Sequence, residues 1–274
     1  MVSGDFSSQH KEVAKLVAEA VAAERIYLLG CTVSHVRTES IFADAAAASA
    51  FVSHCYMLVL VSKSGANSCH NLQDKIENHC RSYIPVTAIV ADMQRYNDWL
   101  TEGHPFAISV SKTAECLHDA GNVKHIHPAD AGEEQQPVKL NEAYFNAGLN
   151  KVEEFLAGAD LFRLREQNKM AAFMLHQAAE QALHTLFRIS TGLYVNTHSI
   201  DRLIRYCSMV SHKIAAIFPR NNDKNEHIFQ LLQKAYIDSR YKENYSIKLE
   251  DLLTITERVR ALEGIVKETY NKLK

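Results

Sequence analysis

The sequence predicts an α/β part followed by an all-α helical bundle. Three observations lead to this prediction. Short β-branched runs alternate with amphipathic stretches up to about residue 118, helical periodicity fills residues 139–274, and a polar stretch lies between them. With 274 residues, 47% hydrophobic and 23% charged, the chain has the length and composition of one large globular domain or two ordinary ones.

The first part, residues 1–127, is expected to alternate helices and strands. Residues 8–24 read as a helix with one apolar face, and Arg25–Gly30 follows as a short buried strand that ends at the glycine. Between Cys31 and Ser53 the pattern favours a polar stretch and then an alanine-rich helix. The remaining elements are a strand at 56–62, a helix at 71–80, a strand at 85–90, a short helix at 92–101 and a helix–strand piece reaching about 118.

A polar stretch separates the two parts. Residues 127–137 contain two prolines, a glycine and no aliphatic anchor, which is typical of a linker, here placed at 128–138. The charge also differs: residues 1–138 hold 10 basic and 16 acidic side chains (−6), and residues 139–274 hold 20 and 16 (+4). Neither half has a dense basic run, which argues against avid nonspecific nucleic-acid binding but is compatible with a local patch.

Five helices are expected in residues 139–274, arranged as an up-and-down bundle. The second, from Met170 to Gly192, organises the others because small alanines in its apolar stripe permit close helix approach. That stripe consists of Ala171, Leu175, Ala179, Leu183 and Leu186. The other four are a helix at 140–156 ended by Gly158 and Asp160, one capped by Asn196 or Thr197 that runs to about His212, one spanning Ile228–Tyr236, and one that starts at Ser246.

Six scattered cysteines, none in a CxxC pair, are typical of reduced thiols and not of a disulfide framework or a zinc site. The first residues lack the apolar core of a signal peptide, and the longest plain apolar run, Cys55–Val61, is too short to span a bilayer. The sequence therefore predicts a soluble cytoplasmic protein with no membrane partner.

The order of elements in residues 1–127 resembles a minimal nucleotidyltransferase domain. In that family Gly-Ser follows the first strand, two acids separated by one residue lie at the second, and a third acid lies on the third. These acids hold Mg²⁺ against the triphosphate. Here Gly30 is followed by Cys31, and the strand positions carry Met57, Val59, Thr87 and Ile89.

No acid stands at the strand positions that would converge, because Asp44 and Asp92 lie outside them. The resemblance therefore implies a degenerate transferase domain that uses no cofactor. Mg²⁺ is expected only if the domain is active through acids at other positions. Gly30 remains a candidate ligand-binding residue.

Three separated motifs in the second part resemble a HEPN domain, a nucleotide-binding domain of prokaryotes and higher eukaryotes. They are HQAAEQAL at 176–183, THSI at 197–200 and SRY at 239–241, and the resemblance covers roughly residues 139–272. A nucleotidyltransferase-like domain preceding it is the family's common arrangement. The resemblance implies a homodimer through the bundle and a nucleotide or RNA ligand. An alanine-rich face that would otherwise stay exposed supports the dimer.

Many HEPN proteins are ribonucleases that pair an arginine with a histidine separated from it by four to six intervening residues, as charge stabiliser and general acid/base in a dimer. Here Arg240 has no such histidine, and Tyr245, at the shortest spacing, is a poor base because its reference pKa is near 10. Two other pairs have suitable spacing but the wrong location, Arg205 with His212 and Arg220 with His227.

His176, Glu180 and His184 are four residues apart on one helical face, a spacing that metal ligands also use. We interpret them as a structural motif of the helix and predict no metal site and no catalytic residue. Arg240 is expected to face a groove lined by His176 and Glu180, or alternatively to pair with Glu180, while Tyr241 packs into the bundle.

The sequence thus predicts a noncatalytic HEPN-type binding module for a nucleotide, nucleic acid or protein, with a vestigial nucleotidyltransferase domain. Its candidate ligand-binding residues are Arg240, Tyr241, His176, Glu180 and Gly30. The alternative is an enzyme, either a divergent HEPN ribonuclease or a nucleotidyltransferase of a toxin–antitoxin-like system.

Overall fold

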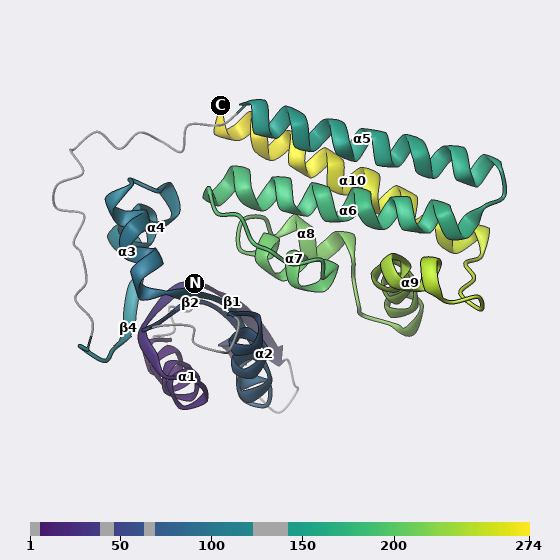
Figure 1. The fold of residues 1–274 in the computed structure, drawn as a ribbon. Helices are drawn as coiled ribbons and strands as arrows, with labels where there is room; N and C mark the ends of the chain where they lie inside the picture. Colours follow the sequence, from purple (N-terminus) through teal and green to yellow (C-terminus); the bar gives the residue numbers. More distant parts are fainter. Residues whose placement is uncertain (1–5, 39–46, 63–68, 123–141) are drawn as a thin grey trace. The chain divides into compact units, whose positions relative to one another are not determined.

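A computed structural model describes residues 6–38, 47–62, 69–122 and 142–274 (Figure 1). The chain divides into two compact units, Met1–Gln135 and Gln136–Lys274. The linker predicted at 128–138 lies outside the described residues, as does Asp44.

The N-terminal unit contains a mixed four-stranded sheet in the order β3-β2-β1-β4. β1 pairs antiparallel with β2 and with β4, and β2 pairs parallel with β3. The strands are β1 Ala23–Thr38, β2 Ala47–Val61, β3 Val86–Asp92 and β4 Glu115–Asp119. The helices are α1 Ser7–Ala20, α2 Cys69–Cys80, α3 Met93–Thr101 and α4 Pro105–Thr113.

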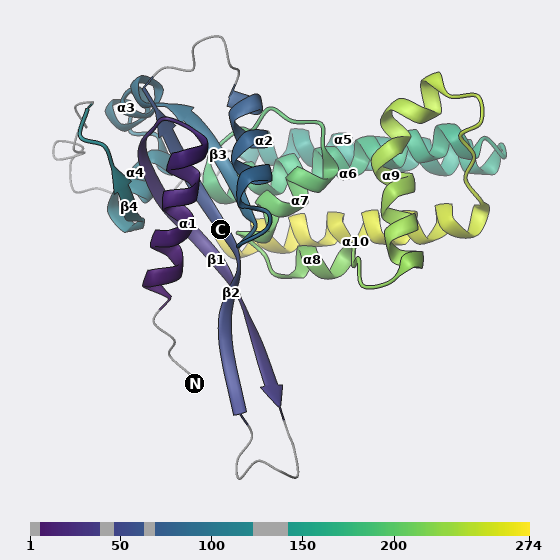
Figure 2. The ribbon, with the colours of Figure 1, turned by 90° about the horizontal axis from the view of Figure 1, so that it is seen from below.

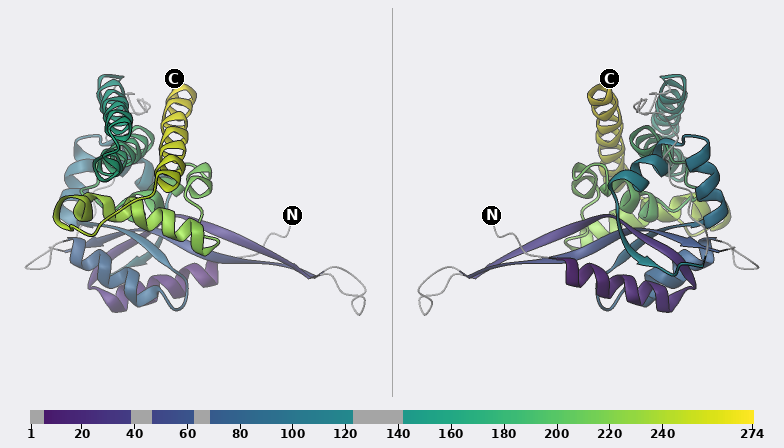
Figure 3. Two further views of the ribbon diagram at one scale, coloured as in Figure 1. Left: turned by 90° about the vertical axis from the view of Figure 1, so that its right-hand side faces the viewer. Right: turned by 90° about the vertical axis from the view of Figure 1, so that its left-hand side faces the viewer.

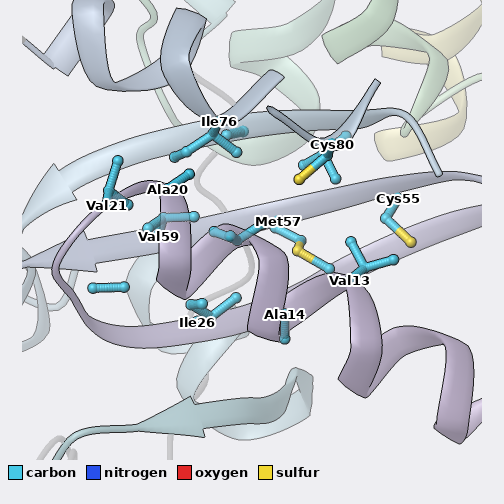
Figure 4. Packing of buried hydrophobic residues seen from close by; sticks show 14 of the residues in the cluster. Val13, Ala14, Ala20, Val21, Ile26, Cys55, Met57, Val59, Ile76 and Cys80 are labelled. Atoms are coloured by element: carbon cyan, nitrogen blue, oxygen red, sulfur yellow. The ribbon is translucent and has the colours of Figure 1, made fainter. Parts of the chain in front are cut away.

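Helices α1 and α2 cover one face of this sheet, and the core lies between these helices and the sheet (Figure 4). Val13 and Ile76 from the two helices meet Ile26, Met57 and Val59 from the strands, and all five side chains are fully buried. Met57 and Val59 share this face because alternate strand residues point the same way. The alternation of strands and helices predicted for this part is confirmed.

The first two strands form a hairpin that is longer than expected (Figures 2 and 3). β1 continues past Gly30 to Thr38, and β2 begins at Ala47, so the alanine-rich helix expected before Ser53 is wrong at least from Ala47 onward. Backbone pairing with β1 outweighs the helix preference of alanine here. Gly30 lies at a register shift between the strands and does not end the first one.

Helices are the only regular secondary structure in the described residues of the C-terminal unit. Three long helices, α5, α6 and α10, lie side by side, and α9 runs across them (Figures 1 and 2). The arrangement therefore differs from five helices running up and down. The helices are α5 Glu142–Leu164, α6 Asn168–Thr191, α7 Ile200–Ser208, α8 Lys213–Ile217, α9 Asp223–Tyr241 and α10 Leu249–Leu273.

Helix α5 runs through Gly158, where the sequence predicted its end, to Leu164. A Cβ built on this glycine would make only ordinary van der Waals contact, 3.5 Å from Met174 Sδ on α6, so packing does not require glycine here. The chain reverses after α5 with Glu166 at a φ of 58°. Gly192 ends α6 with a φ of 77°, as predicted, because glycine adopts the left-handed conformation without steric cost.

Helix α6 is the centre of the C-terminal unit, as predicted, and contacts α5, α7, α9 and α10. Its alanine face is buried within the chain, with Ala171, Ala178, Ala179 and Ala182 at most 1% exposed. The alanine face therefore gives no support to a dimer. No described helix combines the length and apolarity needed to cross a bilayer.

Candidate ligand-binding site

A row of polar side chains runs along one side of α6 at intervals of four residues: His176, Glu180, His184 and Arg188. The first three are buried, and their partners come from elements that pack on α6. His176 Nδ1 donates to the Leu232 carbonyl at 3.0 Å. His184 Nε2 donates to the Thr197 carbonyl at 3.0 Å, and burial lowers the pKa of His184 against the opposing effect of that bond.

Glu180 holds a histidine from the loop before α7. Its Oε1 accepts a hydrogen bond from His198 Nδ1 at 3.0 Å, and its Oε2 lies 3.5 Å from His176 Nε2. Burial acts to raise the pKa of Glu180, but hydrogen bonds and charge from His176 and His198 outweigh it, so the pKa is lowered. The His198 side chain is 66% exposed. An ionised carboxylate at Nδ1 orients the ring and leaves Nε2 available for proton transfer.

The rings around Tyr236 on α9 form a second feature, the Tyr236 cluster, which consists of Phe173, His176, His198, Tyr236 and Arg240. The Tyr236 ring centroid lies 5.4 Å from that of His176 and 5.8 Å from that of His198, whose ring is tilted by only 5°. Arg240 Cζ lies 4.1 Å from the Tyr236 centroid, a cation–π contact.

Arg240 is exposed and is fixed by its own helix, because its Nε donates to the Tyr236 carbonyl at 2.7 Å. Within the described part of the chain it has no carboxylate partner, and Glu180 is occupied by the two histidines. The ion pair between Arg240 and Glu180 that the sequence offered as an alternative is therefore wrong. Arg240 and His176 both contact the Tyr236 ring, and His198, which binds Glu180, stacks on the same ring.

The prediction that Tyr241 packs into the bundle is wrong, because Tyr241 is 73% exposed. Tyr245 is buried instead, and its hydroxyl donates to the Leu231 carbonyl at 3.1 Å. Burial raises the pKa of Tyr245 to about 12, which makes it a structural residue and a still poorer base. Arg205 and Arg220 both form ion pairs with Asp201, so neither guanidinium is free to act with its downstream histidine.

The four strand positions singled out in the N-terminal unit do not share a face. Met57 and Val59 point into the core under α1 and α2, whereas Thr87 and Ile89 alternate with the core residues of β3 and point to the other face. The prediction that these four strand positions converge is therefore wrong. Gly30 lies in this unit, and the nearest atom to a Cβ built on it is Tyr56 Cδ2 at 4.0 Å.

His176 and His184 do not converge on one point, because each binds a different backbone carbonyl. Among the described residues, no group of three or more His, Cys, Asp or Glu side chains has the geometry to hold a metal ion.

Sequence reasoning gave no role to His198 or Tyr236, which the structure places between the predicted residues His176, Glu180 and Arg240. His198 stood inside the THSI motif, but its contact with Glu180 spans 18 residues and depends on how the loop folds back. Helical or strand periodicity in the sequence does not predict a contact between residues 18 positions apart across a loop.

Comparison with known proteins identifies a domain in the C-terminal unit. The family model of the HEPN domain matches residues 146–269, a span that starts within α5 and ends within α10. A search of curated proteins found no match for the chain. The C-terminal unit of this chain thus contains a HEPN domain at residues 146–269.

Proposed function

We propose that the HEPN domain binds a phosphate-bearing ligand, a nucleotide or RNA, at the Tyr236 cluster and does not alter it. The observation that carries this proposal is the state of Arg240: exposed, seated on the Tyr236 ring and without a carboxylate partner among the described residues. A guanidinium offers parallel N–H groups that match a phosphate in bidentate fashion. Because Nε is already bonded to the chain, the two terminal nitrogens are the groups that remain.

Two further features support an anionic, base-containing ligand. His198 presents Nε2 beside the same Tyr236 ring and adds a second donor for a phosphate oxygen when it is protonated. Aromatic rings beside a cation are also the usual platform on which nucleobases stack. Residues 139–274 carry the chain's excess of positive charge, +4, which favours approach of an anion.

The direct test is Arg240→Lys, which keeps the charge and removes the planar fork. We expect this change to weaken binding of fluorescent ATP and of a labelled eight-nucleotide adenylate RNA by roughly tenfold, with the melting temperature nearly unchanged. Arg260→Lys on α10, where Arg260 pairs with Asp160, is the matched control and should leave binding intact. A lower melting temperature with unchanged binding would make Arg240 a structural residue and would remove the proposal's anchor.

A second candidate function is cleavage of RNA, which the pairing of His198 with Glu180 favours. His198 Nε2 would take the proton of a 2′-hydroxyl, the 2′-oxygen would attack the phosphorus, and the 5′-oxygen would leave with a proton from water. Arg240 would stabilise the added charge on the phosphate. Cleavage of labelled RNA to a 2′,3′-cyclic phosphate by the wild-type chain, lost in His198→Gln, would replace the noncatalytic proposal with this one. RNA that is bound but intact after prolonged incubation would count against it.

For the N-terminal unit we propose a vestigial transferase that moves no nucleotide. Support comes from β2 and β3, which carry no acid on either face before Asp92 at the end of β3. Two Mg²⁺ ions need several carboxylates to hold them against a triphosphate. Labelled ATP with Mg²⁺ or Mn²⁺ should therefore leave no adduct on protein or RNA, and a stoichiometric adduct that disappears in Asp92→Ala would overturn this proposal.

A further inference from the structure

A second exposed arginine lies at the other end of the α6 polar row and repeats the arrangement of Arg240. Arg188 Cζ lies 4.0 Å from the ring centroid of Tyr144 on α5 and 5.9 Å from that of Tyr194 in the loop after α6. Its side chain is exposed, and no described carboxylate pairs with it. An arginine held between two aromatic rings keeps its N–H edge free for an anion.

The loop between α6 and α7 connects the two arginines. Leu193 and Thr197 are buried, whereas Tyr194 and His198 point outward and are 59% and 66% exposed. The loop follows α6, because the Thr197 carbonyl accepts from His184 and the Tyr194 ring stacks on the His184 ring at 5.8 Å.

Aromatic and cationic groups, all exposed except the half-buried Tyr236, therefore follow one another along α6. We call this set the α6 strip; from one end to the other it consists of Arg240, Tyr236, His198, Tyr194 and Arg188. Glu180, beneath the strip, is buried and hydrogen-bonded to His198, so it presents no exposed negative charge to a ligand.

The length of the strip sets the kind of ligand it fits. Arg240 contacts Phe173, which is 15 residues before Arg188 on α6 and so, at about 1.5 Å per residue, roughly 22 Å away. The phosphates of a single nucleotide cannot reach both arginines. A single strand can, because grooves that alternate cations with stacking rings hold about four or more nucleotides.

Resting on the phosphate site proposed at Arg240, we propose that Arg188 is a second phosphate site and that the ligand is single-stranded nucleic acid lying along the α6 strip. Phosphates contact Arg240 and Arg188, and a base stacks on Tyr194 between them. Rings alternate with cations along this strip, and the exposed ring of Tyr194 between the two arginines favours nucleic acid, whose bases stack on aromatic rings, over an acidic peptide.

The test compares ligands of two lengths on the full chain. Fluorescent ATP and a labelled eight-nucleotide adenylate RNA are titrated against the wild-type chain, Arg188→Ala, Arg188→Lys and Tyr194→Ala, with Arg260→Ala as the charge-matched control. Arg188→Ala should weaken binding of the RNA roughly tenfold, leave ATP binding unchanged and reduce the salt dependence of RNA binding by about 0.7 in log–log slope. Arg188→Lys keeps the charge and should recover only part of the loss, and Arg260→Ala should have no comparable effect.

Unlabelled competitors identify the chemical class. Inorganic polyphosphate should displace the RNA from the wild-type chain less well than an unlabelled adenylate strand of equal charge, and Tyr194→Ala should remove that difference. If an octaglutamate peptide competes as well as the strand, the strip reads charge alone and the assignment to nucleic acid is wrong.

Failure of this inference is separable from failure of the proposed function. Equal effects of Arg188→Ala on ATP and RNA, or no effect on either, would overturn the second site while leaving Arg240 in place. Absence of wild-type binding to both ligands would overturn the proposed function and this inference together.

Discussion

At the scale of single residues, Glu180 is a buried carboxylate whose lowered pKa depends on two histidines. A carboxyl group whose folded pKa is lowered contributes stability that is fully present above its unfolded value, near 4.5, and is lost as the pH falls through the folded value. Glu180→Gln should therefore lower the free energy of unfolding by about 1–3 kcal/mol at neutral pH. That difference should shrink below pH 4.5.

Urea unfolding of the wild-type chain and of Glu180→Gln between pH 7 and pH 3 measures the difference in their free energies of unfolding directly. A deficit of constant size across that range would mean that the charge of Glu180 does not stabilise the fold. Glu153→Gln is a suitable control, because that carboxylate is exposed and its one ion pair among the described residues is with Lys267 at the surface.

The sequence predicted only in part which of these residues are buried and which are exposed. The sequence selected Arg240, His176 and Glu180 as candidate ligand-binding residues, a role that stays a prediction, and it assigned the buried position to Tyr241 when Tyr245 occupies it. Helical spacing predicts which face of a helix a residue occupies only for residues inside the helix. Tyr241 is the last residue of α9, and the chain beyond it turns Tyr245 back under Leu231.

At the scale of elements, close packing of α5 on α6 depends on a glycine. A Cβ built on Gly148 would lie 2.2 Å from the Oγ1 atom of Thr185, a side chain that is itself buried. Gly148→Ala should therefore destabilise the fold by about 1–3 kcal/mol despite the better helix propensity of alanine.

Two other helical glycines serve as matched controls for this prediction. A Cβ on Gly264 meets nothing within 4 Å, and one on Gly158 makes ordinary contact with the flexible Met174. Alanine at either position should be neutral or stabilising by up to about 1 kcal/mol. Adding Thr185→Ala to Gly148→Ala should recover part of the loss. Equal effects of alanine at all three glycines would contradict the packing explanation.

The elements that the sequence misjudged share a physical cause. The alanines at 47, 48 and 50 favour a helix locally, but pairing with β1 draws them into a strand, and Gly158 looks like a helix end but lies inside α5, against Met174 of α6. Elements with strong periodicity of their own, such as α6 and the final helix, were predicted to within a few residues.

At the scale of the whole molecule, the C-terminal unit has a core of its own around α6. We therefore expect residues 139–274 alone to unfold cooperatively with a helical circular-dichroism spectrum, and non-cooperative melting would contradict this.

We also propose that the helical bundle forms a homodimer. Sedimentation of the same fragment at micromolar concentration should give twice the monomer mass, and a monomer would remove it.

The two-part organisation was predictable because alternating strands and continuous helical periodicity leave different patterns in the sequence. The crossing of α9 and the return of the loop along α6 were not, because both depend on contacts between residues far apart in the chain. The proposed site lies at those contacts, which is why the sequence gave no role to His198 and Tyr236.

The central claim is that a phosphate-bearing ligand binds at the Tyr236 cluster. It is tested most directly by NMR of the full chain, with the imidazole signals of histidine and the Nε–H signals of arginine assigned and followed while ATP is added. The account predicts that His198 and Arg240 shift together and saturate at one ligand concentration, while Arg260 does not move. Saturable shifts confined to other histidines and arginines, or no shift at His198 and Arg240, would contradict it.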